Sequence, residues 1–263
     1  MVLSLEAAGQ SLTSLREIGR AAGISPGFAR KLAHGLVEKG WLQRARRGEF
    51  LLNPSRHGPD ALPNLDPLRL GAFLVTPYYY GYGTAAELHG LLRQAGRVYY
   101  IVTPKRLASR RLGTSELRPI RLTPSHFFGA THVVRRGLDL MVSDLERTVL
   151  DCVSRPDFSG GVSGVAHAVA LAKPRLNWTR LGTYIRRYGN ASLGRRIGYL
   201  TERLRPSTPV PARFLDRLLP RLSDPFSPLV TSRRYGRRGS HDARWHIIRN
   251  LDERELYAEG EIP

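Results

Sequence analysis

The sequence predicts an α+β protein in which a small amino-terminal helical domain precedes a larger mixed domain. Its 263 residues are 41% hydrophobic and 24% charged, proportions that are typical of globular proteins. This length is sufficient for two hydrophobic cores. A helical periodicity followed by a hairpin pattern opens the chain, whereas strand and helix patterns mix beyond a segment rich in proline.

The charge of the chain is strongly unbalanced. Lys and Arg number 41 against 22 Asp and Glu, which gives a formal net charge of +19 and an isoelectric point near 11.0. A folded protein this basic repels itself unless an anionic partner offsets the charge, and nucleic acid is the usual partner. The alternative is a solvated arginine surface without a ligand. Adjacent arginines recur at Arg110-Arg111, Arg135-Arg136, Arg186-Arg187, Arg195-Arg196, Arg233-Arg234 and Arg237-Arg238.

The sequence shows no sign of export or of membrane insertion. Cys152 is the only cysteine, so it has no partner for an internal disulfide. Its neighbours Val149 and Val153 indicate a buried, inert thiol. Met1–Gln10 lacks the basic and apolar regions of a signal peptide, and no apolar run reaches the length of a membrane span. We therefore expect a cytoplasmic protein.

Two short helices are predicted near the amino terminus. Ser14 is a suitable N-cap for a helix that ends at Gly23. Ser25 begins a second helix with Pro26 in its first turn, and Gly40 ends that helix. Apolar spacing predicts the inward-facing residues of the second helix to be Phe28, Ala29, Leu32, Ala33, Leu36 and Val37.

A β-hairpin is predicted directly after the second helix. Trp41–Arg44 and Glu49–Leu52 have strand patterns, and they flank a turn at Ala45–Gly48. The order of helix, tight turn, helix and hairpin resembles a winged helix-turn-helix, whose second helix enters the major groove of DNA. A winged helix used for protein contacts, or a helical hairpin with a solvated basic face, is the alternative interpretation.

The predicted DNA contacts come from the second helix and from the hairpin. Arg30 is placed to reach a guanine edge, and Lys31 and His34 are placed to bind bases or phosphates. Ser25 and the unpaired amides of the first turn suit a phosphate, because helix amino termini favour anions, and Gly27 allows close approach. Arginines on a wing reach phosphates or a narrow minor groove. The candidate DNA-binding residues are Ser25, Gly27, Arg30, Lys31, His34, Arg44, Arg46 and Arg47.

A linker and a larger mixed domain follow the hairpin. Asn53–Pro67 is polar and interrupted by prolines, so we predict a DNA-binding domain at 1–56, a linker at 57–67 and a second domain at 68–263. Early in that domain, a helix pattern at Thr84–Leu92 and strand patterns at Val98–Val102, Leu117–Leu122 and Leu138–Val142 occur. Helix patterns then dominate at Ser143–Val153, Val162–Ala172, Trp178–Arg187, Ala191–Leu204 and Pro209–Leu222, before a strand near Arg244–Ile248.

The polar residues of the Ser143–Val153 helix have a structural interpretation. Ser143 and Glu146 have the spacing of a capping box. Arg147 and Asp151 are four residues apart, as in an intrahelical ion pair.

No catalytic residue, metal site or cofactor is predicted. Glu87 and His89 are two residues apart on a predicted helix, so their side chains point apart. The other histidines lack the helical spacing of zinc ligands, and the sequence has no phosphate-binding glycine loop and no nucleophile elbow. A nucleic-acid enzyme is therefore the less favoured hypothesis.

Segments in four places along the chain carry a family resemblance. They are Leu36–Pro54 (LVEKGWLQRARRGEFLLNP), Tyr78–Thr103 (YYYGYGTAAELHGLLRQAGRVYYIVT), Val142–Asp151 (VSDLERTVLD), and Ala191–Leu200 (ASLGRRIGYL) with Arg244–Asn250 (RWHIIRN). In these segments the chain resembles the AbiEi-type antitoxins of type IV toxin–antitoxin systems. The first helix usual in this family would have to come from Leu3–Gln10 here.

The resemblance implies a winged helix joined to a carboxy-terminal antitoxin domain. A protein of this kind is a monomer that binds inverted repeats in its own promoter cooperatively, as a transcriptional repressor. Its genetic partner is a nucleotidyltransferase-like toxin, which it opposes without needing a stable complex. The resemblance assigns no contact residue in the second domain. The alternative is a winged-helix protein that acts through RNA or protein binding without operator recognition.

Overall fold

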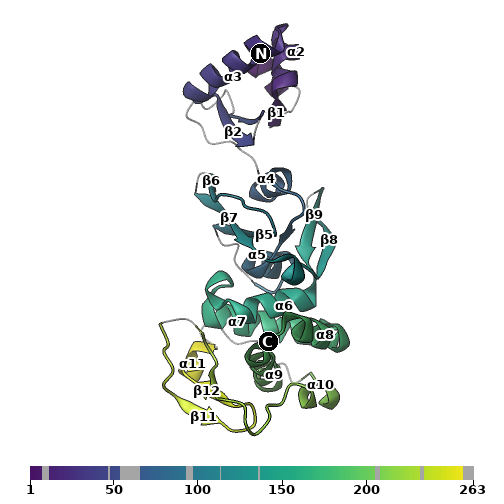
Figure 1. Cartoon of the computed structure of the whole chain (residues 1–263), viewed down its shortest axis with the longest axis vertical. Helices are drawn as coiled ribbons and strands as arrows, with labels where there is room; N and C mark the ends of the chain where they lie inside the picture. Colours follow the sequence, from purple (N-terminus) through teal and green to yellow (C-terminus); the bar gives the residue numbers. More distant parts are fainter. Residues whose placement is uncertain are drawn as a thin grey trace. The chain divides into compact units, whose positions relative to one another are not determined.

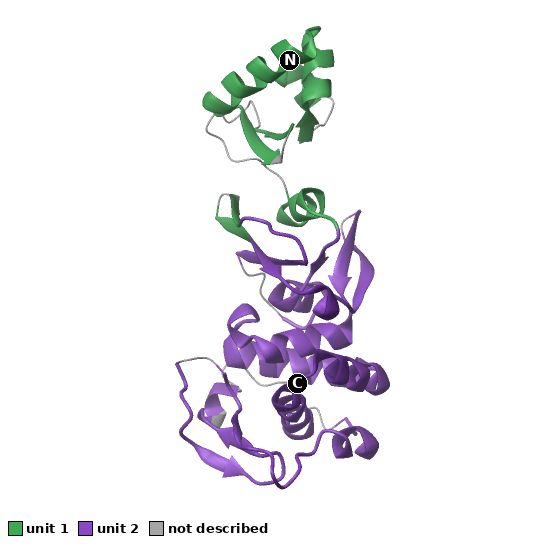
Figure 2. Ribbon diagram, in the orientation of Figure 1, with its two compact units in different colours: residues 1–76, 109–117 green, residues 77–108, 118–263 purple. Residues whose placement is uncertain are grey.

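A computed structural model shows the chain as two compact units (Figure 2). The first unit comprises Met1–Thr76 and Ser109–Leu117, and the second comprises Pro77–Ala108 and Arg118–Pro263. Helices occur together with several sheets, which confirms the predicted α+β class. The residues that the structure describes are 1–7, 12–46, 48–53, 66–92, 97–112, 114–135, 137–204, 208–231 and 234–256.

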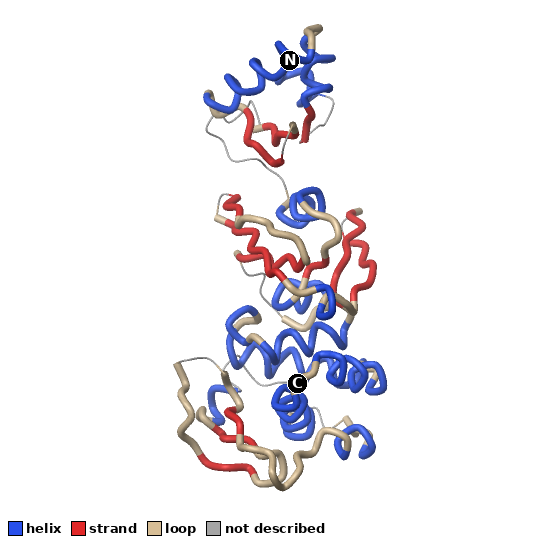
Figure 3. Tube along the Cα trace, viewed as in Figure 1, coloured by secondary structure: helices blue, strands red, loops and turns tan. Residues whose placement is uncertain are grey.

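The first unit begins with helices and a small antiparallel sheet (Figures 1 and 3). The elements in chain order are α1 (Val2–Ala7), β1 (Leu12–Ser14), α2 (Leu15–Ala22), α3 (Pro26–Glu38), β2 (Leu42–Arg46) and β3 (Glu49–Leu52). The strand order is β1-β3-β2, and both pairs are antiparallel. The two predicted helices and the predicted hairpin are therefore confirmed, and α1 overlaps the Leu3–Gln10 segment from which an earlier helix would have to come.

The ends of α2 follow directly from the local sequence. Ser14 Oγ accepts a hydrogen bond from the amide of Glu17, and a Glu17 carboxylate oxygen accepts one from the Ser14 amide, which completes a capping box. Gly23 ends the helix with φ 65°, a conformation that favours glycine. Ser25 stands at the N-cap position of α3 with Pro26 in the first turn, but its side chain makes no capping hydrogen bond.

The helices and the hairpin of this part bury one apolar cluster between them. Its buried members are Leu5, Ile18, Ala29, Ala33, Leu42, Phe50 and Leu52. The prediction that Phe28 also faces inward is wrong, because this ring is 65% exposed. A helix turns by about 100° per residue, so a side chain one position before Ala29 points well away from the core that Ala29 faces.

A further helix and a short hairpin complete the first unit. α4 (Pro67–Leu74) has Asp66 as its N-cap, and Asp66 Oδ1 accepts a hydrogen bond from the Leu68 amide at 2.9 Å. β6 (Arg110–Leu112) pairs antiparallel with the start of β7 (Ser115–Arg121). Most of the linker predicted at 57–67 lies outside the described residues, so the boundaries 1–56, 57–67 and 68–263 stay predictions.

The sheet of the second unit contains both antiparallel and parallel strand pairs. The strands added to β7 are β4 (Tyr79–Tyr80), β5 (Val98–Thr103), β8 (Ala130–Arg135) and β9 (Leu138–Ser143). Their order is β7-β5-β4-β9-β8, in which β4 runs parallel to β9 and antiparallel to β5. β8 and β9 form a long antiparallel hairpin.

Helices and a second small sheet make up the rest of the second unit. The helices are α5 (Tyr82–Leu88), α6 (Leu145–Ser154), α7 (Gly161–Ala172), α8 (Trp178–Tyr188), α9 (Ala191–Arg203), α10 (Ala212–Asp216) and α11 (Glu253–Leu256). The strands β10 (Ser227–Pro228), β12 (Ile247–Arg249) and β11 (Ser240–Asp242) lie in this order in the small sheet. Within the described residues, none of the helices is long and apolar enough to span a membrane.

The helices and the last strand predicted for this unit are confirmed with corrections to their bounds. The helix predicted at Thr84–Leu92 is α5, which ends at Leu88. The helix predicted at Pro209–Leu222 is limited to α10, and the residues after it form turns rather than helix. The strand predicted at Arg244–Ile248 begins only at Ile247, because residues 243–246 form a turn in which His246 has φ 47°.

Trp245 fixes the position of α9. Its indole ring is 1% exposed, and Nε1 donates a hydrogen bond to Glu202 Oε2 at 2.7 Å. The ring packs against Gly198 so closely that a Cβ at this position would overlap it. Two segments of the sequence, Ala191–Leu200 and Arg244–Asn250, therefore meet in the core through a glycine and a tryptophan.

Replacing Gly198 by alanine should destabilise the protein. We expect Gly198→Ala to lower the free energy of unfolding by about 1–3 kcal/mol, because overpacking a core has a cost of this size. Gly182→Ala in α8 is a matched control, since a Cβ there would lie 3.7 Å from the Phe214 ring. This substitution should be neutral, or stabilising by up to about 1 kcal/mol. Urea denaturation of the full chain measures the free energy of unfolding of both variants. Equal effects would contradict the close packing of Trp245 on Gly198.

Candidate nucleic-acid interface

The five residues of α3 and its N-cap that were predicted to bind DNA all lie on the surface. The exposed side chains or backbone positions are those of Ser25, Gly27, Arg30, Lys31 and His34. The opposite side of the helix contributes Ala29 and Ala33 to the buried core. This face of α3 is therefore not used in packing the hydrophobic core, and a ligand can reach it.

The side chains at the start of this face combine positive charge with an aromatic ring. Lys31 Nζ lies 5.9 Å from the centroid of the exposed Phe28 ring, a geometry typical of a weak cation–π contact. Arg30 forms no ion pair or hydrogen bond with any described residue, so its guanidinium keeps all of its donors for a ligand.

His34 is less available than the sequence suggested. Its Nδ1 lies 3.4 Å from Oε1 of Glu38, one turn further along α3, and both side chains are exposed. A carboxylate at this distance reduces the attraction of the imidazole for a phosphate. Among the candidate residues of this helix, Arg30 and Lys31 are therefore the stronger ones.

The amino-terminal end of α3 offers backbone donors beside these side chains. Gly27 and Phe28 lie in the first turn, where amides have no intrahelical carbonyl to bind. The Ser25 hydroxyl is not used for capping, and Ser25 O accepts the helical bond from the amide of Ala29. This arrangement suits an anion, because the helix dipole is positive at this end.

Only part of the predicted hairpin contact can be placed. Arg44 is exposed on β2, directly opposite Phe50 of β3. A bulge at Ala45, which is buried, shifts the register before Arg46. The side chain of Arg46 and the whole of Arg47 lie outside the described residues.

Two arginines that sequence reasoning did not assign to this region line a hollow with Arg44. The hollow has a volume of about 340 Å³, and Arg110 and Arg111 of β6 contribute to its wall. Arg110 Nη2 lies 3.5 Å from the carbonyl oxygen of Ala45. Nothing in the sequence could link these residues to the hairpin, because Arg110 and Ala45 are 65 positions apart.

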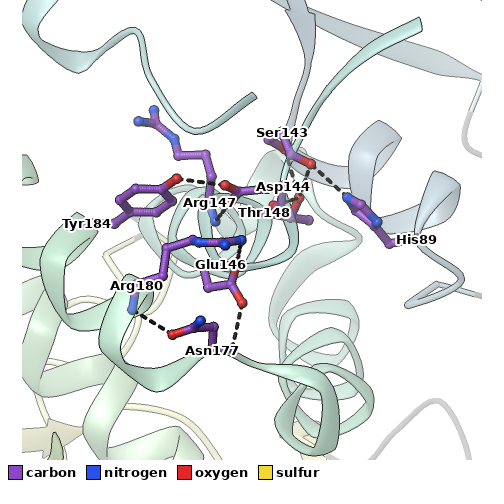
Figure 4. Close-up of polar contacts among 9 residues, drawn as sticks. All are labelled: His89, Ser143, Asp144, Glu146, Arg147, Thr148, Asn177, Arg180 and Tyr184. Carbon is purple, nitrogen blue, oxygen red and sulfur yellow. Dashed lines mark hydrogen bonds and ion pairs between the residues drawn. The ribbon is translucent and has the colours of Figure 1, made fainter. Parts of the chain in front are cut away.

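In the second unit, the Val142–Asp151 motif comprises the end of β9, the N-cap of α6 and most of α6 (Figure 4). Asp144 is the N-cap, with Oδ1 accepting a hydrogen bond from the Arg147 amide at 2.8 Å and Oδ2 accepting one from the Tyr184 hydroxyl at 2.7 Å. The predicted capping box of Ser143 and Glu146 is wrong. Ser143 is the last residue of β9, so the helix begins one position later than the spacing suggested.

The other polar residues of this motif join neighbouring elements to α6 (Figure 4). Glu146 is buried, and its Oε1 accepts a hydrogen bond from the Asn177 amide at 2.7 Å. Its other oxygen lies 3.4 Å from Arg180 Nη1 in α8. His89 Nε2 donates to the Ser143 carbonyl at 2.7 Å. These contacts support a structural role for the motif.

The predicted ion pair of Arg147 and Asp151 is confirmed, and both side chains are completely buried. Arg147 Nε donates to Asp151 Oδ1 at 2.9 Å, and Nη1 donates to the His126 carbonyl at 2.8 Å. The guanidinium carbon also lies 4.4 Å from the centroid of the Phe128 ring. Burial raises the pKa of Asp151 to about 6, while the Arg147 charge acts in the opposite direction. At neutral pH the carboxylate is thus ionised.

The residues considered for catalysis lie apart. Glu87 Oε1 is 3.6 Å from Arg135 Nη2, whereas His89 binds the Ser143 carbonyl. Cys152 is buried, and burial raises the pKa of its thiol to about 12, so it is not a nucleophile at neutral pH. Among the described side chains, no group of three or more His, Cys, Asp and Glu is arranged to hold a metal ion.

Comparisons with known proteins give a fold relationship and no family. No protein-family model and no curated protein matches the sequence. The crystal structure of the Rv2827c protein from Mycobacterium tuberculosis is similar to this chain, with a TM-score of 0.66 and 18% sequence identity. The similarity covers 99% of this chain and 93% of the mycobacterial chain. The two proteins therefore have a similar fold.

Removing the Asp151 carboxylate should strongly destabilise the chain. We expect Asp151→Asn to lower the free energy of unfolding by about 3–5 kcal/mol, because it leaves the buried Arg147 charge without a counter-charge. Asp139→Asn is the matched control, since Asp139 pairs with His132 and both side chains are exposed. Its effect should stay below about 1 kcal/mol. Chemical denaturation at neutral pH measures both free energies of unfolding. A small effect of Asp151→Asn would show that the ion pair contributes little to stability.

Proposed function

We propose that the first unit contains a winged helix-turn-helix that binds double-stranded DNA, and that the chain is a transcriptional repressor of its own promoter. The observation that carries this proposal is the exposed basic face of α3. That face follows a tight turn at Gly23 and precedes an antiparallel hairpin, as in winged helices. The protein would act in the cytoplasm, where the operator DNA lies.

In this proposal α3 enters the major groove and the hairpin contacts the flanking backbone. Arg30 reads a guanine edge through two parallel hydrogen bonds, which its unpaired guanidinium can supply. Lys31 and His34 bind bases or phosphates, while Ser25 and the amide of Gly27 hold one phosphate at the helix end. Arg44, Arg46 and Arg47 lie on the wing and bind phosphates or the narrow minor groove. The net charge of +19 supports a polyanionic partner such as double-stranded DNA.

We further propose that the chain is the antitoxin of a type IV toxin–antitoxin system. This part rests on the resemblance to AbiEi-type antitoxins in four places along the chain. The two segments of the last place contact each other in the core through Gly198 and Trp245. The second unit would oppose a nucleotidyltransferase-like toxin, without a requirement for a stable complex. The chain would bind inverted repeats as a monomer in solution, with cooperative contacts between copies on the DNA.

A second candidate function is the binding of RNA or protein without operator recognition. The exposed Phe28 ring beside Lys31 favours it, because an aromatic ring next to a cation is suited to stacking on an unpaired base. Gel shifts with the promoter duplex and with a single-stranded RNA of equal length separate the two candidates. The proposal of a repressor requires the duplex to be bound more tightly.

Arg30 gives the sharpest test of base reading. Arg30→Ala should lower affinity for the promoter by about 1–3 kcal/mol and relax the preference at one base pair, because a bidentate arginine–guanine contact contributes this much discrimination. Arg106→Ala in the second unit removes the same charge from another exposed position and is the control. Equal losses on promoter and random duplexes would show that Arg30 binds only phosphate.

A variant without DNA binding tests the antitoxin proposal separately. Arg30→Ala combined with Lys31→Ala should abolish repression of the promoter, yet the variant should still restore growth when the toxin is induced. The reason is that the activity proposed for the second unit does not involve operator contact. The toxin is expressed from an unrelated promoter, and the amount of each antitoxin variant is checked by immunoblot. If a variant present at the wild-type level fails to rescue growth, protection depends on transcription instead.

A further inference from the structure

A polar hollow lies at the amino-terminal end of α9 in the second unit. Its volume is about 470 Å³. The lining includes the start of α9, the segment around β10 and the loop before β11 (α9 and β11 are labelled in Figure 1). The lining residues on which the inference depends are Asn190, Ser192, Arg196, Ser227, Thr231 and Arg237.

Arg196 places a buried positive charge in the wall of this hollow. The residue is 5% exposed. Its Nε donates to the Ser192 carbonyl at 3.3 Å, one turn back along α9, so the guanidinium points towards the start of the helix. Its Nη1 is buried without a hydrogen-bond partner, and no carboxylate of the described residues lies within ion-pair distance. A buried charge in this condition is costly.

The neighbouring residues add to this imbalance. Arg195 is also buried, and its Nη1 lies 3.5 Å from Asp224 Oδ2. The nearby carboxylate is thus already opposite another arginine. Burial lowers the pKa of Arg196 to about 10, with an opposing contribution from Tyr188 and a smaller lowering by Arg195. The Arg196 guanidinium is therefore still charged at neutral pH.

Further donors converge on the same space. α9 has 13 residues, and the Asn190 side chain caps only the amide of Leu193. The amides before Leu193 in the first turn have no intrahelical partner. Ser227 Oγ is buried without a hydrogen-bond partner, and Thr231 supplies a second hydroxyl to the wall. Arg237 is exposed at the edge of the hollow.

We propose that this hollow binds a phosphate group, with the buried Arg196 guanidinium as its counter-charge. A tetrahedral oxyanion accepts hydrogen bonds from several directions, and this wall offers a guanidinium, helix amides and hydroxyls on different sides. The phosphate belongs either to a small free anion or to the backbone of bound DNA. The site is distinct from α3, so its existence does not depend on the proposed operator recognition.

Calorimetric titration of the full chain with inorganic phosphate, at constant ionic strength maintained with sodium chloride, tests the site. Arg196→Gln should weaken binding about tenfold or more, because a hydrogen bond to a charged group contributes on this scale. Arg237 lies on the surface, so the Arg237→Gln variant should fold normally and bind phosphate up to about fivefold more weakly. Arg106→Gln is the control of equal charge change, and it should leave phosphate binding as it is in the wild type.

The same variants in a gel shift with a short DNA duplex identify the source of the phosphate. Weaker phosphate binding with unchanged duplex affinity assigns the site to a free anion, whereas parallel losses assign it to the DNA backbone. Circular dichroism and urea denaturation verify that each variant is folded. The proposal is overturned if Arg237→Gln and a folded Arg196→Gln change neither binding reaction, or if Arg106→Gln weakens both as much as they do.

Discussion

The buried pair of Arg147 and Asp151 imposes a requirement that the surroundings of α6 meet in part, since Arg147 Nη2 and Asp151 Oδ2 are buried without a hydrogen-bond partner. A guanidinium without solvent needs a carboxylate, a further acceptor and polarisable neighbours, and these come from different parts of the second unit. Asp151 lies on the same helix, the His126 carbonyl precedes β8, and the Phe128 ring stacks near the charge. Gly129, at φ 73°, passes so close to Arg147 that a Cβ would meet it at 2.9 Å. The close approach of the chain to the Arg147 side-chain stem, together with the positive φ, therefore requires glycine at position 129.

Sequence reasoning succeeded where a structure is determined by neighbouring residues. The first turn of α2 is set by Ser14 and Glu17, and its end by Gly23, all within ten residues of one another. The spacing of Arg147 and Asp151 predicted their pairing, because one helical turn separates them. The exposure of Arg30, Lys31 and His34 on α3 could be predicted on the same basis, since helical periodicity separates exposed from buried positions.

Prediction from the sequence failed where the position of a side chain depends on contacts between segments that are distant along the chain. Apolar spacing marked Phe28 and Ala29 together as inward-facing, and only the packed structure shows that the core contains Ala29 and leaves the Phe28 ring exposed. Ser143 and Asp144 are both good N-caps, and only the extent of β9 decides between them. The pair Arg195 and Arg196 could not be told from a basic surface pair in the sequence, yet both are buried. Their chemistry is a property of the tertiary structure.

The packing of Trp245 on Gly198 has a consequence for the synthesis of the chain. Domains fold as units while the ribosome extends them, and the amino-terminal one folds first. The cluster formed by α2, α3 and the hairpin contains only residues up to Leu52, so it can close early. The face of α9 that receives Trp245 stays uncovered until translation has passed that residue. During this interval we expect the nascent chain to expose apolar surface of the kind that favours aggregation, while its helices near the amino terminus can already be folded.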